Sequence, residues 1–138
     1  MKNKKGFTLV ELLAVIVILA IIIILVVPNV FTAMEKAKKN AFVIEARKVI
    51  NAGMNQVQTN ILAGAETQSC YTFAELHIDS GDKYHGSIAY DSVNNTYKIY
   101  MEDGTYYVKG KTFSELSDMS NIGKGSYTKS LAESCRAS

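Results

Sequence analysis

The stretch KKGFTLVELL, residues 4–13, joins a basic N-terminal segment to a long apolar run. Glu11 is the only charged side chain between Phe7 and the end of that run, and residues 12–27 are sixteen consecutive residues without a polar side chain. As a helix, the 21 residues from Phe7 onward would be roughly 31 Å long. A bilayer has a hydrocarbon core of about 30 Å. We therefore expect a membrane-spanning helix, with one carboxylate near its start.

Two other interpretations of the apolar run fit less well. A buried core helix would need a second apolar element large enough to cover it, and the remaining sequence has none. A secretory signal peptide would have a shorter apolar stretch followed by a small-x-small cleavage site, which residues 26–29 do not offer. Lys2, Lys4 and Lys5 precede the run, so the positive-inside rule predicts a cytoplasmic N-terminus and an extracytoplasmic C-terminal part.

Residues 4–13, with the basic leader before them and Pro28 after the apolar run, resemble the N-terminal signature of type IV pilins and of the pseudopilins of secretion and competence systems. The resemblance implies that a prepilin peptidase cuts between Gly6 and Phe7 and methylates the new amine of Phe7. It also implies a leader peptide at residues 1–6, a transmembrane and filament-core helix at residues 7–28, and an extracytoplasmic pilin domain at residues 29–138.

Glu11 has two interpretations. It could be an acid that snorkels, or is protonated, near a helix start, where the helix dipole favours a negative charge by ~0.3–1 kcal/mol. A charge in the membrane costs ~2.5–3.5 kcal/mol on insertion scales, which the dipole alone does not offset. The resemblance implies the second interpretation, an assembly contact between Glu11 and the Phe7 amine of a neighbouring subunit. We expect Pro28 to kink the helix, while Ala20, at a position where the family often has Gly, favours helix.

Beyond Pro28 the pattern becomes amphipathic and predicts an α+β fold. Apolar residues recur at helical spacing as far as residue 61, so we expect one helix over residues 7–62 that ends near Gly64. We expect strands at residues 87–91, 96–102 and 105–109, with turns at residues 94–95 and at Asp103-Gly104. The small antiparallel sheet should cover the helix stripe, as in the pilin fold. The stripe consists of Phe42, Ala46, Val49, Ile50, Gly53, Val57 and Ile61.

Two further features concern the body of the chain. Residues 72–76 and 112–116 each begin with a Thr-x-x-Glu capping box, which predicts two short helices. Cys70 and Cys135 are the only cysteines. On the expected topology both leave the reducing cytoplasm, which favours a disulfide over two free thiols.

No catalytic constellation, metal site or cofactor motif is recognised, and we expect a protein that is not an enzyme. His77 and His85 lack metal-ligand spacing, and residues 79–82 are too short for an EF-hand loop. Removal of the leader would take away three lysines and leave 12 basic against 13 acidic side chains, which gives no electrostatic support for DNA binding. Nucleic acid is expected as a partner only if the chain is a competence pseudopilin.

The first functional hypothesis is a structural subunit of a type IV pilus or a pilus-like filament. Its expected partners are copies of itself, other pilins, the prepilin peptidase, the inner-membrane assembly machinery and membrane lipid. It would sit in the cytoplasmic membrane before assembly and at the cell surface afterwards. The alternatives are a pseudopilin of a type II secretion or competence system, and a membrane-tethered minor adhesin. An adhesin could use an aromatic patch of the tyrosines at positions 90, 97, 100, 106 and 107, although most of these more simply pack on strand faces.

Overall fold

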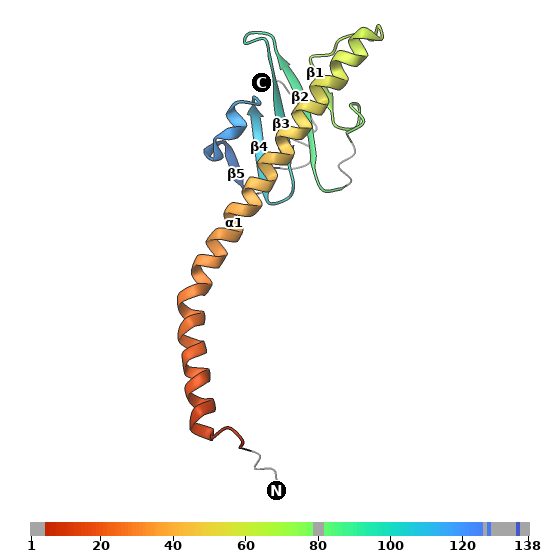
Figure 1. Ribbon diagram of the computed structural model, residues 1–138. Coiled ribbons are helices and arrows are strands. Elements are labelled where there is room, and N and C mark those ends of the chain that lie inside the picture. The colour runs from red at the N-terminus through yellow and green to blue at the C-terminus, as the bar shows by residue number, and fades with distance from the viewer. Residues whose placement is uncertain (1–4, 79–81, 126, 128–134, 136–138) are drawn as a thin grey trace. The chain divides into compact units, whose positions relative to one another are not determined.

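The computed structural model describes residues 5–78, 82–125, 127 and 135 (Figure 1). The chain divides into two compact units, residues 1–37 and 38–138. The long helix α1 (Leu9–Leu62) contributes its N-terminal half to the first unit and its C-terminal half to the second. In the second unit, α1 packs against a five-stranded antiparallel sheet, so the fold is α+β with a pilin-like arrangement.

The sheet is a meander in which each strand pairs with the next one along the chain. Two short 3₁₀ helices, η1 (Glu115–Ser117) and η2 (Met119–Asn121), connect the fourth strand to the fifth. The predicted central strand has the observed bounds, and its two neighbours differ from prediction by one or two residues at their ends. The strands are β1 (Cys70–Thr72), β2 (His85–Asp91), β3 (Thr96–Glu102), β4 (Tyr106–Lys111) and β5 (Ile122–Lys124).

Both predicted hairpin turns are present, and an aspartate organises each of them. Asp91 Oδ1 accepts hydrogen bonds from the amides of Val93 (3.0 Å) and Asn94 (3.3 Å), and Asn95 has a positive φ of 50°. In the next turn, Asp103 Oδ1 accepts from the amides of Thr105 (2.8 Å) and Tyr106 (2.7 Å). Gly104 has a φ of 85°, a conformation that costs glycine little. These local bonds set the register of β2–β3–β4.

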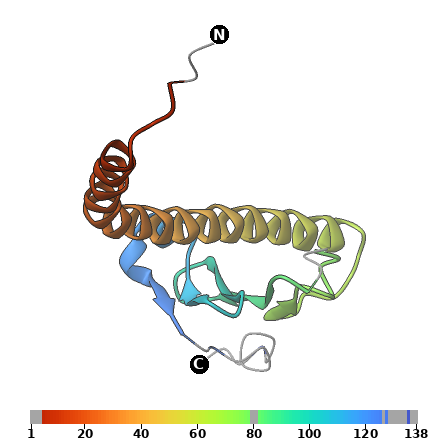
Figure 2. The same ribbon diagram turned by 90° about the horizontal axis from the view of Figure 1, so that it is seen from below.

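The hydrophobic core of the second unit lies between residues 42–57 of α1 and one face of the sheet (Figure 2). Ala46 and Ile50 of α1, and Ile88 and Ile99 of the strands, are completely buried. Gly53 is needed here because a Cβ at this position would overlap the Ile88 side chain. The predicted stripe is therefore confirmed as core from residue 42 to residue 57, and Val43 joins it.

The buried stripe of α1 ends earlier than predicted. Ile61 was expected in the core, but 44% of its surface is exposed. It lies beyond Val57, the last buried residue of α1, and it lines a groove between α1 and the sheet. The helix itself ends as predicted: Gly64 has a φ of 84°, and the amide of Ala65 donates to the Asn60 carbonyl at 2.9 Å. This is a Schellman-type C-terminus.

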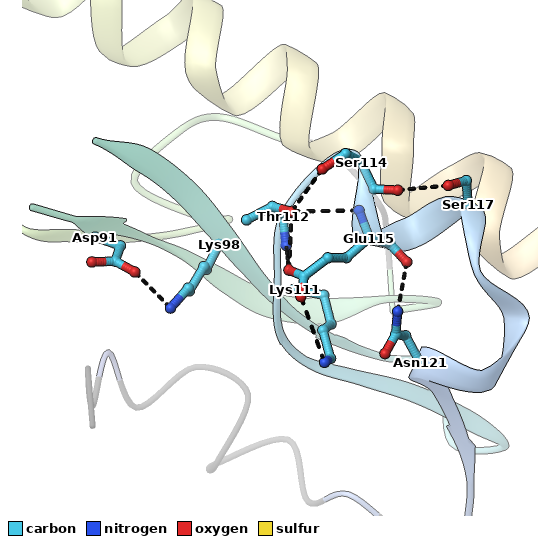
Figure 3. Close-up of polar contacts among 8 residues, drawn as sticks. All are labelled: Asp91, Lys98, Lys111, Thr112, Ser114, Glu115, Ser117 and Asn121. Carbon is cyan, nitrogen blue, oxygen red and sulfur yellow. Dashed lines mark hydrogen bonds and ion pairs between the residues drawn. The ribbon is translucent and has the colours of Figure 1, made fainter. Parts of the chain in front are cut away.

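Both predicted capping boxes are present, but only one of them starts a helix. The Thr72 amide donates to Glu75 at 2.7 Å, and the single turn that follows closes at His77, whose φ is 53°. The Thr112 amide donates to Glu115 at 2.8 Å, and the 3₁₀ helix η1 follows (Figure 3). The prediction of two helices was wrong for the first box, because the chain changes direction at His77 after a single turn.

The terminal strands β1 and β5 were not predicted from the sequence. Each has only three residues, and each pairs with a longer neighbour: Tyr71 lies opposite Ile88, and Ile122 lies opposite Val108. Tyr71 and Ile122 are both buried, which shows that packing on the core holds these strands in place. They extend the sheet by one strand on each side.

Candidate assembly site at the start of the long helix

The first described residues form an open, non-helical segment before α1. Lys5, Gly6, Phe7 and Thr8 have no regular secondary structure and are exposed. Phe7 is 93% exposed, and a Cβ built at Gly6 would meet no atom within 4 Å. The Gly6–Phe7 bond is therefore exposed and lies outside regular secondary structure.

Thr8 and Glu11 fix the start of α1 by a reciprocal capping box. The Thr8 amide donates to Glu11 Oε2 at 2.9 Å, and the Glu11 amide donates to Thr8 Oγ1 at 3.2 Å. The helix therefore begins at Leu9, two residues after the predicted start. A carboxylate in the first turn is also favoured by the helix dipole.

Thr8 is the residue at this site that the sequence analysis did not identify. The spacing Thr8-x-x-Glu11 is the same pattern that was recognised at Thr72 and Thr112. The same chemistry holds in all three places: a hydroxyl and a carboxylate satisfy two backbone amides at the start of a turn. Glu11 is therefore fixed to its own backbone in the single chain.

The apolar run that follows Glu11 is exposed along its whole length. Every residue from 9 to 27 is exposed, and the large apolar side chains among them range from 40% to 85% exposed. The helix is long and apolar enough to cross a membrane, and none of its most apolar stretch is buried within the structure. So much apolar surface requires lipid or other protein to cover it.

Pro28 lies inside α1, and the α-helix continues through both Ala20 and Pro28. Proline has no amide hydrogen, so the carbonyl four residues earlier loses its helical partner. Two polar side chains hydrogen-bond to the backbone nearby: Asn29 Nδ2 donates to the Leu25 carbonyl at 3.3 Å, and Thr32 Oγ1 donates to the Pro28 carbonyl at 3.2 Å. The kink at Pro28 stays a prediction.

Cys70 and Cys135 form a disulfide that joins the first residue of β1 to the C-terminal segment, 65 residues later. Their Cα atoms are 5.4 Å apart. Among the described residues there is no group of three or more His, Cys, Asp or Glu side chains that could hold a metal ion. His77 lies in a turn and His85 begins β2, while residues 79–81 of the acidic segment lie outside the described residues.

The exposed helix and its capped start can be compared with known protein families. Residues 1–27 match the prokaryotic N-terminal methylation motif. This motif is the signature of type IV pilins and pseudopilins, and it supports membership of that family. No curated protein and no solved structure matched the chain.

The methylation motif covers Gly6, Phe7, Thr8 and Glu11 and ends just before Pro28. All four residues that surround the expected cleavage and assembly site therefore lie within the matched segment. The motif, the apolar helix and the Cys70–Cys135 disulfide together fit a pilin-type protein with a membrane-spanning helix.

Proposed function

We propose that this protein is a structural subunit of a type IV pilus or a pilus-like filament. A prepilin peptidase removes residues 1–6 and methylates Phe7, and the subunit then assembles through the N-terminal half of α1. The observation that carries this proposal is the methylation motif at residues 1–27, which leads into an apolar helix with every residue from 9 to 27 exposed.

The exposed apolar surface of α1 would be covered in two successive ways. Before assembly, residues 7–28 span the cytoplasmic membrane, where acyl chains surround the helix. After assembly, the same side chains pack against the equivalent helices of neighbouring subunits in the core of the filament. Transfer from lipid to protein leaves the hydrophobic contribution nearly unchanged, because both environments are apolar. Polar contacts would then determine the axial position of each subunit in the filament.

Glu11 provides such a contact in this proposal. The capping box uses its Oε2 atom for the Thr8 amide. A carboxylate has two oxygens with about four acceptor positions in total, so the other oxygen can accept the positively charged Phe7 amine of a neighbour while the box stays intact. Pairing with the amine would offset the cost of a charge in an apolar surrounding. Glu11 thereby sets the axial position of the incoming subunit.

The proposed location follows from the same residues. Lys5 and the lysines before it stay cytoplasmic, where the peptidase cuts, and the unit formed by residues 38–138 lies outside the membrane. The Cys70–Cys135 disulfide is consistent with a non-reducing space. Assembly would bring the subunit together with other pilins and the inner-membrane assembly machinery at the cell surface.

Substitution of Glu11 tests this function in cells that make the filament. We expect Glu11→Ala and Glu11→Gln to insert in the membrane normally and to lower the yield of sheared filaments at least about tenfold. Neither side chain carries the negative charge that pairs with the Phe7 amine of a neighbour. Glu45→Gln is the matched control, because Glu45 lies on the same helix outside the motif and forms an ion pair with Lys48 at 3.6 Å. Unchanged filament yield in both Glu11 variants would refute the pairing role.

A further inference from the structure

A groove of about 690 Å³ lies where the last turns of α1 extend past the sheet core. Its walls come from three segments: residues 54–61 of α1, residues 67–69 before β1, and residues 90–97 at the β2–β3 hairpin. Figure 1 shows these elements together at the C-terminal end of α1. The volume falls within the range of small-molecule sites, about 300–1,000 Å³. The filament proposal gives this groove no role.

The apolar part of the groove is aromatic and partly exposed. The rings of Tyr90 and Tyr97 have centroids 5.2 Å apart and are tilted by 54°, so they form a corner. Tyr90 is 37% exposed and Ile61 is 44% exposed, whereas Val57 beneath them is buried. A ring face has a negative potential and attracts the weakly positive C–H groups of a ligand.

The polar part of the groove is made of amides and hydroxyls. Gln58, Gln68 and Asn95 contribute carboxamides, each with two donors and one acceptor oxygen, and Thr67, Ser69 and Thr96 add hydroxyls. Among the described residues, none of those that line the groove is Asp, Glu, Lys or Arg. This lining therefore offers a phosphate backbone no cation, and a wholly apolar ligand would leave its amides unpaired.

Hydrogen bonds hold this arrangement in place. The Tyr90 hydroxyl donates to Asn95 Oδ1 at 2.5 Å, which leaves the Asn95 NH₂ group free to donate to a ligand. The Tyr90 amide donates to the Ser69 carbonyl at 2.7 Å, and the Gln68 amide donates to the Tyr71 hydroxyl at 2.8 Å. Cys70, which follows Ser69 in the sequence, carries the disulfide. The wall formed by residues 67–69 is thus fixed on β2 and β1 before any ligand arrives.

We propose that this groove binds a neutral carbohydrate. A pyranose ring has an apolar C–H face, which fits on Tyr90 and Tyr97, and a rim of hydroxyls that both donate and accept, which fits the carboxamides of Gln58, Gln68 and Asn95. A neutral sugar uses an aromatic corner and several amides together, and it needs no charged group. The protein would then combine a surface-exposed sugar site with its role in a filament.

Titration of the full-length protein with sugars tests the proposal. The protein is kept in dodecylphosphocholine micelles, because maltoside and glucoside detergents would compete for the site. The probes are cellotriose, maltotriose and the trimer of N-acetylglucosamine, each up to about 10 mM, with a thymidine dodecamer and an uncharged tripeptide as probes of other classes. We expect at least one trisaccharide to bind and to shift the NMR resonances of Tyr90 and Asn95.

Variants then assign the binding to the groove. Tyr90→Ala should weaken binding about tenfold or more, as truncation of a central tyrosine does. Val93→Ala should leave it unchanged, because Val93 is 89% exposed on the same hairpin and does not line the groove. On the helix, Gln58→Ala should weaken binding and Asn55→Ala should not. Proton NMR checks that each variant is folded.

Three results would overturn the proposal: binding of none of the trisaccharides, binding of the dodecamer or the tripeptide in their place, or sugar binding that survives Tyr90→Ala and Gln58→Ala. None of these results bears on filament assembly, which rests on residues 1–27. The two proposals therefore fail independently.

Discussion

Thr8 and Glu11 satisfy each other's backbone amides across the first turn of α1, with hydrogen bonds of 2.9 Å and 3.2 Å. The carboxylate that makes the apolar run unusual is thus already held in position in a single chain. We interpret the capping box as the device that orients Glu11 toward the N-terminus of the helix, where a neighbour's amine would meet it.

Removal of the Thr8 hydroxyl should loosen this turn. We expect Thr8→Ala to destabilise the start of α1 by about 0.5–2 kcal/mol, the usual cost of losing such a cap, and Thr8→Ser to keep most of the stability. Hydrogen exchange of the amides of residues 9–12, in the full-length protein in micelles, measures the effect. Equal protection in all three proteins would show that the box contributes nothing.

The contact between Gly53 and Ile88 gives a prediction whose sign depends on the background. Gly53→Ala alone should destabilise the second unit by about 1–3 kcal/mol, because the new Cβ overlaps the buried Ile88 side chain. In an Ile88→Val background the overlapping Cδ1 atom is gone, and the same change should cost much less, since alanine favours helix by about 1 kcal/mol over glycine. Denaturant unfolding gives the free energy of unfolding of the parent protein, the two single variants and the double variant. If the two changes affect that free energy additively, the close contact between Gly53 and Ile88 is contradicted.

The ion pair at the β2–β3 hairpin predicts a dependence on pH. Lys98 Nζ lies 2.6 Å from Asp91 Oδ2 (Figure 3), and this contact, together with bonds from Asn94 and Val93, holds the pKa of Asp91 well below its usual value. Because the pKa of Asp91 is lower in the folded chain than in the unfolded chain, the ionised carboxylate stabilises the fold at pH values above its unfolded pKa. This contribution is lost as the pH falls below about 4.

The Asp91 carboxyl can be followed directly by NMR as the pH is lowered. In Lys98→Met the pKa of Asp91 should move back toward its usual value, because the largest cause of the shift is removed. Lys109→Met is the control, since Lys109 is an exposed lysine on the neighbouring strand. An identical Asp91 titration in Lys98→Met and the parent protein would contradict this account.

Local patterns predicted the parts of the fold that local bonds determine. The strand β3 had its observed bounds because Asn95 and Gly104, both at positive φ, mark the turns on either side. The three-residue strands β1 and β5 are too short to show alternation, and only pairing with their neighbours defines them. The exposure of Ile61 could not be predicted either, because it depends on how far the folded sheet extends along α1.

The site was predictable to a similar degree. Gly6, Phe7 and Glu11 were identified from their order and spacing; they lie within the matched methylation motif, and their roles stay predictions. Thr8 was missed although its spacing to Glu11 is that of a capping box, because Glu11 had been considered only as an acid near a helix start or as a contact with a neighbouring subunit. The groove combines residues from three separate segments, and of these the sequence indicated only Tyr90 and Tyr97, as part of a possible aromatic patch.

The proposed function requires that this chain is processed at Gly6–Phe7 and built into a filament. Both steps can be checked by mass spectrometry of filaments sheared from cells, after digestion and sequencing of the N-terminal peptide. We expect the mature chain to begin at Phe7 and to carry one methyl group on its α-amine. Filaments that lack this chain, or an exported chain that still begins at Met1, would contradict it.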